Sequence, residues 1–281
     1  LEDARIAPDE IDRVLAAALE HKRPVYIGIP RDQFTAQVDP ERIPVEYRRP
    51  GSNPEALESA VTEARDLIRA ARQPVLWAGE ELQRHGLAQT LLALVEASGV
   101  PFATSALGKG ILAETHPRAL GVYNGALAPA AVRDYVEGAD CVVQLGVMKA
   151  DLNYGFFTTK LEDTGLIRAS ATRVEIGRRV YEQVRIEDFL AGLAGAAYGR
   201  QEPGPLPSPT PPAAFEPVPG KRLTAERLFE AIDAFADERT VFATDNGETT
   251  WAGINLLVRA DQGFFSPGYY ASVGYSVPTA L

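Results

Sequence analysis

The middle of this 281-residue chain is predicted to fold as an α/β domain built on a doubly wound parallel sheet. Between residues 52 and 199, short apolar runs alternate with stretches in which apolar residues recur at helical spacing. The runs are nearly continuous, as in strands that are buried on both faces of a parallel sheet. The composition, 46 % hydrophobic and 23 % charged residues, is that of a globular protein.

Helices and strands of this middle segment are predicted from the period of the apolar residues. Strands that are separated by helices of this length form βαβ units, and such units build a parallel sheet. In chain order, the predicted elements are a helix over residues 57–71, a strand over 74–79, a helix over 87–97, and strands over 100–104, 139–147 and 173–176.

The first part of the chain, residues 1–46, contains too few elements for a core of its own. Helical spacing predicts a helix over residues 8–21, and the apolar run 24–30 predicts a strand of the kind buried in a parallel sheet. One helix and one strand cannot form an independent core. Because the chain also lacks an initiator Met and stops in the apolar residues 277–281, we expect it to be an excerpt of a longer protein.

A proline-rich stretch separates the middle segment from the last one. Eight prolines lie between Glu202 and Gly220, a density that excludes helix and favours extended backbone. We interpret residues 202–222 as a semi-rigid spacer between domains rather than as a ligand for an SH3 domain.

The last segment, residues 223–281, is predicted to open another α/β domain. Thr224 is a suitable N-cap for a helix over residues 225–236. The apolar run 240–244 predicts a strand, and a second helix is expected to start at Thr249.

Charge and composition exclude several classes of partner. The net charge of −10 argues against a nucleic-acid partner. No apolar run approaches the ~18 residues of a membrane span, and the first residues lack the pattern of a signal peptide. The single cysteine, Cys141, lies in an apolar run, so we expect a buried strand residue without a disulfide, in a cytoplasmic protein.

Familiar catalytic motifs are not visible in the sequence. The stretch Gly108-Lys109-Gly110 lacks the full spacing of a phosphate-binding P-loop and is interpreted as a turn. His21, His85 and His116 show no metal-ligand spacing, so we expect surface or capping residues.

The loop over residues 245–250 is a candidate ligand site. Ligands of open α/β sheets bind outside the carboxyl ends of the strands, and this loop follows the strand predicted over residues 240–244. A turn that contains glycine, followed by a helix N-terminus with Thr hydroxyls, can hold phosphate oxygens. Glu248 counts against phosphate, because a carboxylate repels it unless a metal or a hydrogen bond intervenes. A plain turn with Asn-Gly chemistry explains the same residues.

The tail, residues 266–278, is the second candidate. Small residues alternate with Tyr and Val, and Pro278 can be accommodated only near the start of a helix. Such a segment allows the backbone to approach a flat ligand closely. A tightly packed turn is the alternative.

The whole chain, read in order, resembles the thiamine-diphosphate-dependent 2-oxo-acid decarboxylases, the pyruvate, indolepyruvate and phenylpyruvate decarboxylase group. The matching stretches are residues 23–32, 108–110, 114–117, 121–125, 151–155, 245–249 and 267–278. The resemblance implies the C-terminal end of a pyrimidine-binding domain at residues 1–46, the central doubly wound domain at 47–201, the linker at 202–222, and the first part of a diphosphate-binding domain at 223–281.

The resemblance also implies a cofactor site in the last segment. Val273 is similar to the large aliphatic residue that props the thiazolium ring against the pyrimidine. Ala271, where the family more often has Gly, is in the place of the residue whose carbonyl faces the 4′-amino group, and Ser272 lies between them. In the loop, the matching positions are Asn246, which would face the substrate, and Gly247, Glu248 and Thr249, which would touch the cofactor.

The reaction that the resemblance implies is the non-oxidative decarboxylation of a 2-oxo acid to an aldehyde and CO₂, with thiamine diphosphate and Mg²⁺, in a homodimer or homotetramer. The thiamine carbanion adds to the 2-oxo carbon and the cofactor takes up the electrons that CO₂ leaves. The bent cofactor makes its own deprotonation intramolecular. The family's catalytic Glu and its metal-binding Gly-Asp-Gly motif have no match in this chain. We therefore expect no catalytic or metal-ligating residue here, weak cofactor binding and no turnover.

Other functions remain open from the sequence. A carboligating synthase of the acetolactate type shares the superfamily, although the stretch Gly121-x-Tyr123-x-Gly125 favours the decarboxylase branch. A nucleotide- or flavin-binding module would suit the doubly wound pattern, but no Gly-x-Gly-x-x-Gly follows a strand. A non-catalytic scaffold is the remaining alternative. The similarity of residues 266–270 to the phenylpyruvate type favours an aromatic 2-oxo acid as substrate.

Overall fold

The computed structural model describes residues 1–39, 49–199, 203–209 and 215–281. These residues divide into two compact units, Leu1–Gly51 and Ser52–Leu281. The expected domain boundaries near residues 46 and 201, and residues 202 and 210–214 of the expected linker, lie outside the described residues. The division of the chain into four domains therefore stays a prediction.

The first unit contains the helix α1 (Ala7–His21) and a single turn of 3-10 helix at Arg31–Gln33. The predicted helix is confirmed. Pro8 lies in its first turn together with acidic residues, which suit the positive end of the helix dipole. The helix ends at Lys22, which has a left-handed backbone with φ 51°.

The strand predicted over residues 24–30 is wrong. The backbone there belongs to no strand, and the side chain of Tyr26 is 89 % exposed. An apolar run becomes a strand only when a neighbouring strand takes up its hydrogen bonds. The described residues of this unit contain no such strand.

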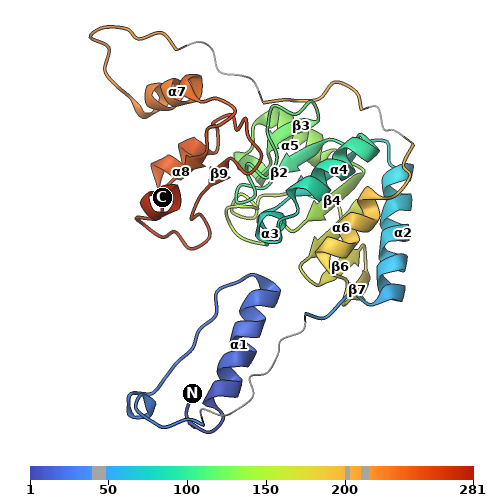
Figure 1. The fold of residues 1–281 in the computed structure, drawn as a ribbon. Helices are drawn as coiled ribbons and strands as arrows, with labels where there is room; N and C mark the ends of the chain where they lie inside the picture. Colours follow the sequence, from blue (N-terminus) through green and yellow to red (C-terminus); the bar gives the residue numbers. More distant parts are fainter. Residues whose placement is uncertain (40–48, 200–202, 210–214) are drawn as a thin grey trace. The chain divides into compact units, whose positions relative to one another are not determined.

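A seven-stranded sheet, drawn in turquoise to yellow in Figure 1, forms the centre of the segment between residues 52 and 199. Its strands are β1 (Pro74–Ala78), β2 (Phe102–Thr104), β3 (Ala119–Val122), β4 (Cys141–Leu145), β5 (Leu166–Ser170), β6 (Arg173–Ile176) and β7 (Arg179–Glu182). Their order is β3-β2-β1-β4-β5-β6-β7. The first five strands pair in parallel. Strand β6 pairs antiparallel with β5, and β7 with β6, because a tight turn joins each strand to the one before it.

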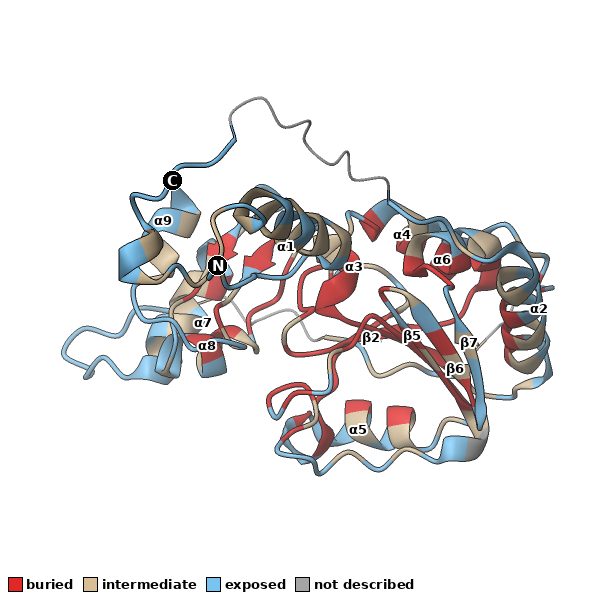
Figure 2. Cartoon of the chain, turned by 90° about the horizontal axis from the view of Figure 1, so that it is seen from below, coloured by how far each residue is buried: buried red, intermediate tan, exposed pale blue. Residues whose placement is uncertain are grey.

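Helices cover both faces of this sheet, which confirms the doubly wound α/β prediction. The helices are α2 (Pro54–Ala70), α3 (Glu80–Arg84), α4 (Ala88–Ser98), α5 (Ala130–Glu137) and α6 (Ile186–Ala194). Figure 2 shows α2, α4 and α6 over one face and α5 over the other. Each face has its own apolar core, with Leu94 and Phe189 in one and Trp77 and Val136 in the other. The expected burial of Cys141 in a strand is confirmed.

The centre of the sheet is the pair β1 and β4. Their register runs from Pro74 opposite Cys141 to Ala78 opposite Leu145, and every residue of both strands is buried. Pro74 is tolerated because it is the first residue of its strand. The nearly continuous apolar runs of the sequence therefore report burial on both faces.

The last segment forms a smaller α/β arrangement. Its elements are α7 (Ala225–Phe235), β8 (Phe242–Ala243), α8 (Glu248–Gly253), β9 (Phe264–Phe265) and α9 (Ser276–Ala280). Strands β8 and β9 pair in parallel over a small core that includes Phe242, Val258 and Phe264. The hydroxyl of Thr224 accepts a hydrogen bond from the Arg227 amide at 3.3 Å, so the predicted N-cap is confirmed.

Among the described residues, no helix combines the length and the apolar character that crossing a bilayer requires.

Candidate functional site

The loop between β8 and α8 follows the carboxyl end of a strand, as predicted. Gly247 has φ 104° and ψ −145°, a backbone conformation that glycine alone adopts without strain. The side chains of Asn246, Glu248 and Thr249 are exposed, and Glu248 is the first residue of α8. The turn therefore presents the predicted loop residues to solvent.

Threonine hydroxyls close this loop from inside. The hydroxyls of Thr249 and Thr250 donate to the carbonyl of Asp245 at 2.8 and 2.6 Å. Thr250 is buried, and its Oγ1 lies 3.0 Å from Oγ of Ser266. The proton of each hydroxyl is therefore already used by the loop itself.

Asp245 joins the loop to the tail. Its two carboxylate oxygens accept the backbone N–H of Gly274 at 3.0 and 2.9 Å, and one of them accepts the hydroxyl of Ser276 at 3.1 Å. It also accepts the backbone N–H of Asn246 at 2.9 Å. The structure thus brings together two segments that the sequence treats as separate candidates.

The charge on Asp245 is favoured by these contacts. Desolvation acts to raise its pKa, but the hydrogen bonds from the amides of Asn246 and Gly274 and from Ser276 outweigh it. The pKa of Asp245 therefore lies below its usual value. Sequence reasoning passed over this residue, although an acidic residue directly after a strand was the available signal.

The tail turns back at Ala271. The amides of Tyr270 and Ala271 donate to the carbonyl of Pro267 at 3.1 and 2.8 Å, and Ala271 has φ 52°. A left-handed backbone costs a residue with a Cβ roughly 1–2 kcal/mol, which gives a physical reason why glycine is favoured at such a position. Ser272 is exposed, and the side chain of Val273 is 86 % exposed and belongs to no core.

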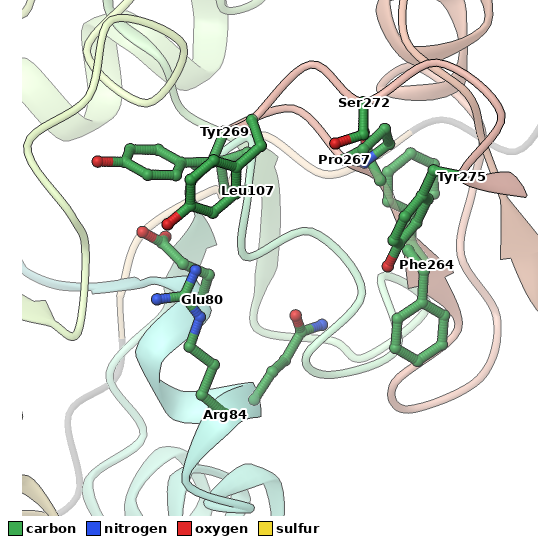
Figure 3. A pocket seen from close by; sticks show the side chains of 12 residues that line it. Glu80, Arg84, Leu107, Phe264, Pro267, Tyr269, Ser272 and Tyr275 are labelled. Carbon is green, nitrogen blue, oxygen red and sulfur yellow. The ribbon is translucent and has the colours of Figure 1, made fainter. Parts of the chain in front are cut away.

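A pocket lies between α3 of the central sheet and this tail. Figure 3 shows Glu80 and Arg84 on one wall, with Pro267, Ser272 and Tyr275 on the other. Of the residues predicted for the site, Ser272 lines it. The full lining is Glu80, Gln83, Arg84, Leu107, Phe264, Phe265, Ser266, Pro267, Tyr269, Tyr270, Ser272 and Tyr275.

Glu80 is a buried acid in this pocket that the sequence did not single out. It follows β1 and accepts the Met148 amide at 3.1 Å, the Asn153 side-chain amide at 3.1 Å and the Ser105 hydroxyl at 3.3 Å. Burial raises the pKa of the Glu80 carboxyl. Asn153 is fully buried and also accepts the backbone amide of Leu107 at 3.0 Å, so it ties two loops together.

His21, in the last turn of α1, is exposed, as expected. The expectation of a surface or capping residue is also confirmed for His85, the C-cap residue of α3, although its side chain is 1 % exposed and its Nδ1 lies 2.8 Å from Oε1 of Glu187. It is confirmed for His116, whose Nδ1 accepts the amide of Arg118 at 3.1 Å. Across the described residues, no group of three or more His, Cys, Asp or Glu side chains is placed to hold a metal ion.

Comparison with known proteins gives one family and a consistent set of relatives. Residues 61–192 match the family described as the central domain of thiamine pyrophosphate enzymes. The chain is 31 % identical to an alpha-keto-acid decarboxylase of Mycobacterium leprae over 97 % of its length and 48 % of that relative. It is 30 % identical to an indole-3-pyruvate decarboxylase of Azospirillum brasilense, over 100 % of the chain and 51 % of the relative.

A more distant match has the same extent. The identity to a pyruvate decarboxylase of Candida glabrata is 27 %, over 99 % of the chain and 50 % of that relative. The chain thus spans about half the length of the curated relatives that it matches.

Proposed function

We propose that the chain, whose residues 61–192 match the central domain of thiamine pyrophosphate enzymes, belongs to these enzymes and serves the non-oxidative decarboxylation of a 2-oxo acid to an aldehyde and CO₂. The observation that carries this proposal is the link made by Asp245. Its carboxylate holds together the loop and the tail to which the family resemblance assigns the cofactor contacts.

The residues of the tail fit thiamine diphosphate. The carbonyl of Ala271 accepts no hydrogen bond from the described part of the chain, so it is available to an amino group. Val273 presents an exposed aliphatic side chain two residues further on, as a prop for a bent cofactor requires. When bound, the cofactor supplies the carbanion and takes up the electrons that CO₂ leaves.

The loop contributes differently. Gly247 leaves open space at its Cα, and we assign its backbone, with Thr249, to contact with the cofactor and Asn246 to contact with the substrate. Since the proton of Thr249 is donated to Asp245, its hydroxyl can only accept there. Glu248 faces a diphosphate with like charge, which a divalent cation such as Mg²⁺ offsets. We assign no ligand to that cation within the described ranges.

For the substrate, we propose an aromatic 2-oxo acid. The support is the aromatic character of the pocket beside the tail, which Tyr269, Tyr270 and Tyr275 line, and the name of the Azospirillum relative, an indole-3-pyruvate decarboxylase. Pyruvate is the smaller alternative that the Candida relative's name suggests.

We also propose a cytoplasmic homodimer or homotetramer. The support for the compartment is the single cysteine, Cys141, which is free and buried and cannot form a disulfide within the chain, as suits a reducing compartment. Light scattering of the protein in its natural length measures the oligomeric state, and a monomer contradicts that part of the proposal.

The decisive experiment assays the protein in its natural length with Mg²⁺, thiamine diphosphate and phenylpyruvate, indolepyruvate or pyruvate. We expect CO₂ and the corresponding aldehyde. Acetolactate as the product from pyruvate favours a carboligase instead, and a flavin spectrum without decarboxylation favours a flavin-binding module.

A substitution at Val273 tests the assigned site. Truncating an exposed side chain changes stability by no more than about 0.5 kcal/mol, so Val273→Ala should leave the melting temperature unchanged. We nevertheless expect kcat to fall by at least about tenfold, because the prop for the cofactor is removed. Val180→Ala, at an exposed aliphatic residue of β7, is the matched control. Equal activity in both variants contradicts the assignment of Val273.

A further inference from the structure

The turn at residues 108–110, which the proposed function does not use, holds a buried ion pair. Nζ of Lys109 lies 2.6 Å from Oε1 of Glu114, and their side chains are 1 % and 4 % exposed. The predicted turn is confirmed, but the side chain of Lys109 is buried. Burying two charges costs desolvation free energy, and the attraction between the charges rarely exceeds this cost. Stability alone therefore does not explain why the pair is buried.

Glu114 reaches across to the last segment of the chain. Its Oε2 accepts the backbone N–H of Val258 at 2.9 Å, and its own backbone N–H donates to the carbonyl of Val258 at 2.7 Å. Lysine neutralises the charge while the second oxygen remains free to accept. The carboxylate and the backbone N–H of Glu114 therefore together fix the main chain at residue 258.

Gly110 and Lys109 of the same turn make further contacts with the last segment. The carbonyl of Gly110 accepts the amide of Gly263 at 3.2 Å, and a Cβ on Gly110 would lie 2.8 Å from the backbone of Phe264. Nζ of Lys109 lies 5.7 Å from the centroid of the Phe264 ring. Gly110, with φ 80°, is thus required both for its conformation and for this close approach.

Residues 258–264, which these contacts hold in place, lead directly to the candidate cofactor site. It ends in β9, which pairs with β8, the strand that carries the loop at residues 245–250. The amide of Phe242 in β8 also donates to the carbonyl of Gly263 at 2.9 Å. Beyond β9 the chain continues as the tail. A shift of residues 258–264 therefore moves both halves of the site.

We propose that Lys109 and Glu114 are positioning residues that seat residues 258–264 on the central sheet and thereby set the cofactor loop and tail. The placement of residues 258–264 on the central sheet does not depend on which ligand the site binds. Only its link to thiamine diphosphate rests on the proposed function. The property that matters is the carboxylate oxygen that accepts from Val258, with Lys109 present to make its burial tolerable.

Three variants separate the charges from this acceptor. Lys109→Met with Glu114→Gln removes both charges and keeps an oxygen for the Val258 amide. Lys109→Met with Glu114→Leu removes the charges and the acceptor, and apolar replacement of a complete buried pair is generally compatible with folding. Lys149→Met, at an exposed lysine, is the matched control.

Amide hydrogen exchange, measured by NMR, reports the seating without any ligand. In the Met/Leu variant we expect the amides of Val258, Gly263 and Gly274 to exchange at least about tenfold faster. The Met/Gln variant and Lys149→Met should exchange like wild type. Unchanged amides in β4 show that the central sheet is intact in every variant.

Wild-type exchange at Gly274 in the Met/Leu variant would overturn the proposal, since the seating would then not reach the site. Equal acceleration in the Met/Gln and Met/Leu variants would also overturn it. If the Met/Leu variant does not fold, Lys109→Met with Glu114→Met replaces it, because it removes the same acceptor and fills the site with a flexible side chain. Gly274 must again exchange faster, and unchanged exchange there overturns the proposal.

Cofactor titration separates this inference from the proposed function. With Mg²⁺ present, the Kd of thiamine diphosphate for the protein in its natural length should rise by about tenfold in the Met/Leu variant and recover in the Met/Gln variant. Wild-type protein that binds no thiamine diphosphate contradicts the proposed function, while the exchange result still decides the seating.

Discussion

Single carboxylates after strands set the geometry of the candidate site. Asp245 follows β8 and Glu80 follows β1, and each accepts a backbone N–H from a distant segment, from Gly274 and from Met148. The N–H of Met148 is partly buried and needs an acceptor, whereas Gly274 is exposed; each carboxylate fixes the path of the loop whose N–H it accepts. The sequence did not reveal either role, because an acidic residue after a strand can equally well face solvent.

The raised pKa of Glu80 makes a stability prediction with a definite sign. The folded protein binds a proton at Glu80 at pH values above the usual ~4.3 of an unfolded glutamate. Stability therefore falls as the pH rises from that value through the raised folded pKa. Glu80→Gln removes this dependence and keeps an oxygen for the Met148 amide.

We expect the melting temperature of wild type, relative to Glu80→Gln, to decrease as the pH rises from about 4. Calorimetry at successive pH values measures it. Glu58→Gln, at an exposed glutamate of α2, is the control and should track wild type. If the melting temperature of wild type instead rises relative to that of Glu80→Gln as the pH increases, the prediction is wrong.

Helices and strands were predictable where their own apolar pattern reports burial. The sequence predicts the central strands β1 and β4 because both faces of each strand lie in the core. It predicts the helices α2 and α4 because one stripe of apolar residues on each helix lies in the core. Strand β7, of which no residue is buried, gave no signal. The run 24–30 gave a false one, since its apolar residues find no partner strand among the described residues.

The turn between β8 and α8 should depend on Gly247. Its φ of 104° is open to glycine, so Gly247→Ala should lower the free energy of unfolding by about 1–3 kcal/mol. Gly204→Ala, at an exposed glycine with open space around it and no positive φ, should change it by no more than about 0.5 kcal/mol. Urea unfolding followed by the fluorescence of the two tryptophans, Trp77 and Trp251, measures both. Equal effects contradict the assigned strain.

Burial is distributed unevenly over the whole molecule. Helix α1 buries no residue, whereas every residue of β1 and β4 is buried. An isolated helix of about 15 residues is marginal in water. In hydrogen exchange by mass spectrometry we expect peptides of α1 to exchange fastest and those of β4 slowest. Comparable protection of both contradicts this reading of the structure.

Much of the candidate site lay beyond the reach of sequence reasoning at this scale. The positions Asn246 to Thr249 and Ala271 to Val273 came from resemblance, and their roles stay predictions. What joins them is contact between residues far apart in the chain, such as Asp245 with Gly274 or Glu114 with Val258. No periodicity or local motif records such pairings, because each partner satisfies its local rules by itself.

The grip of residues 108–114 on residues 258–264 limits how this chain can be recombined with its relatives. The two stretches lie on opposite sides of the proline-rich stretch, yet Glu114 makes two hydrogen bonds to the main chain of Val258, and a Cβ on Gly110 would collide with Phe264. A chimera that takes its sheet from one parent and its C-terminal part from another would break this match. Crossover points for such hybrids should keep both stretches from the same parent.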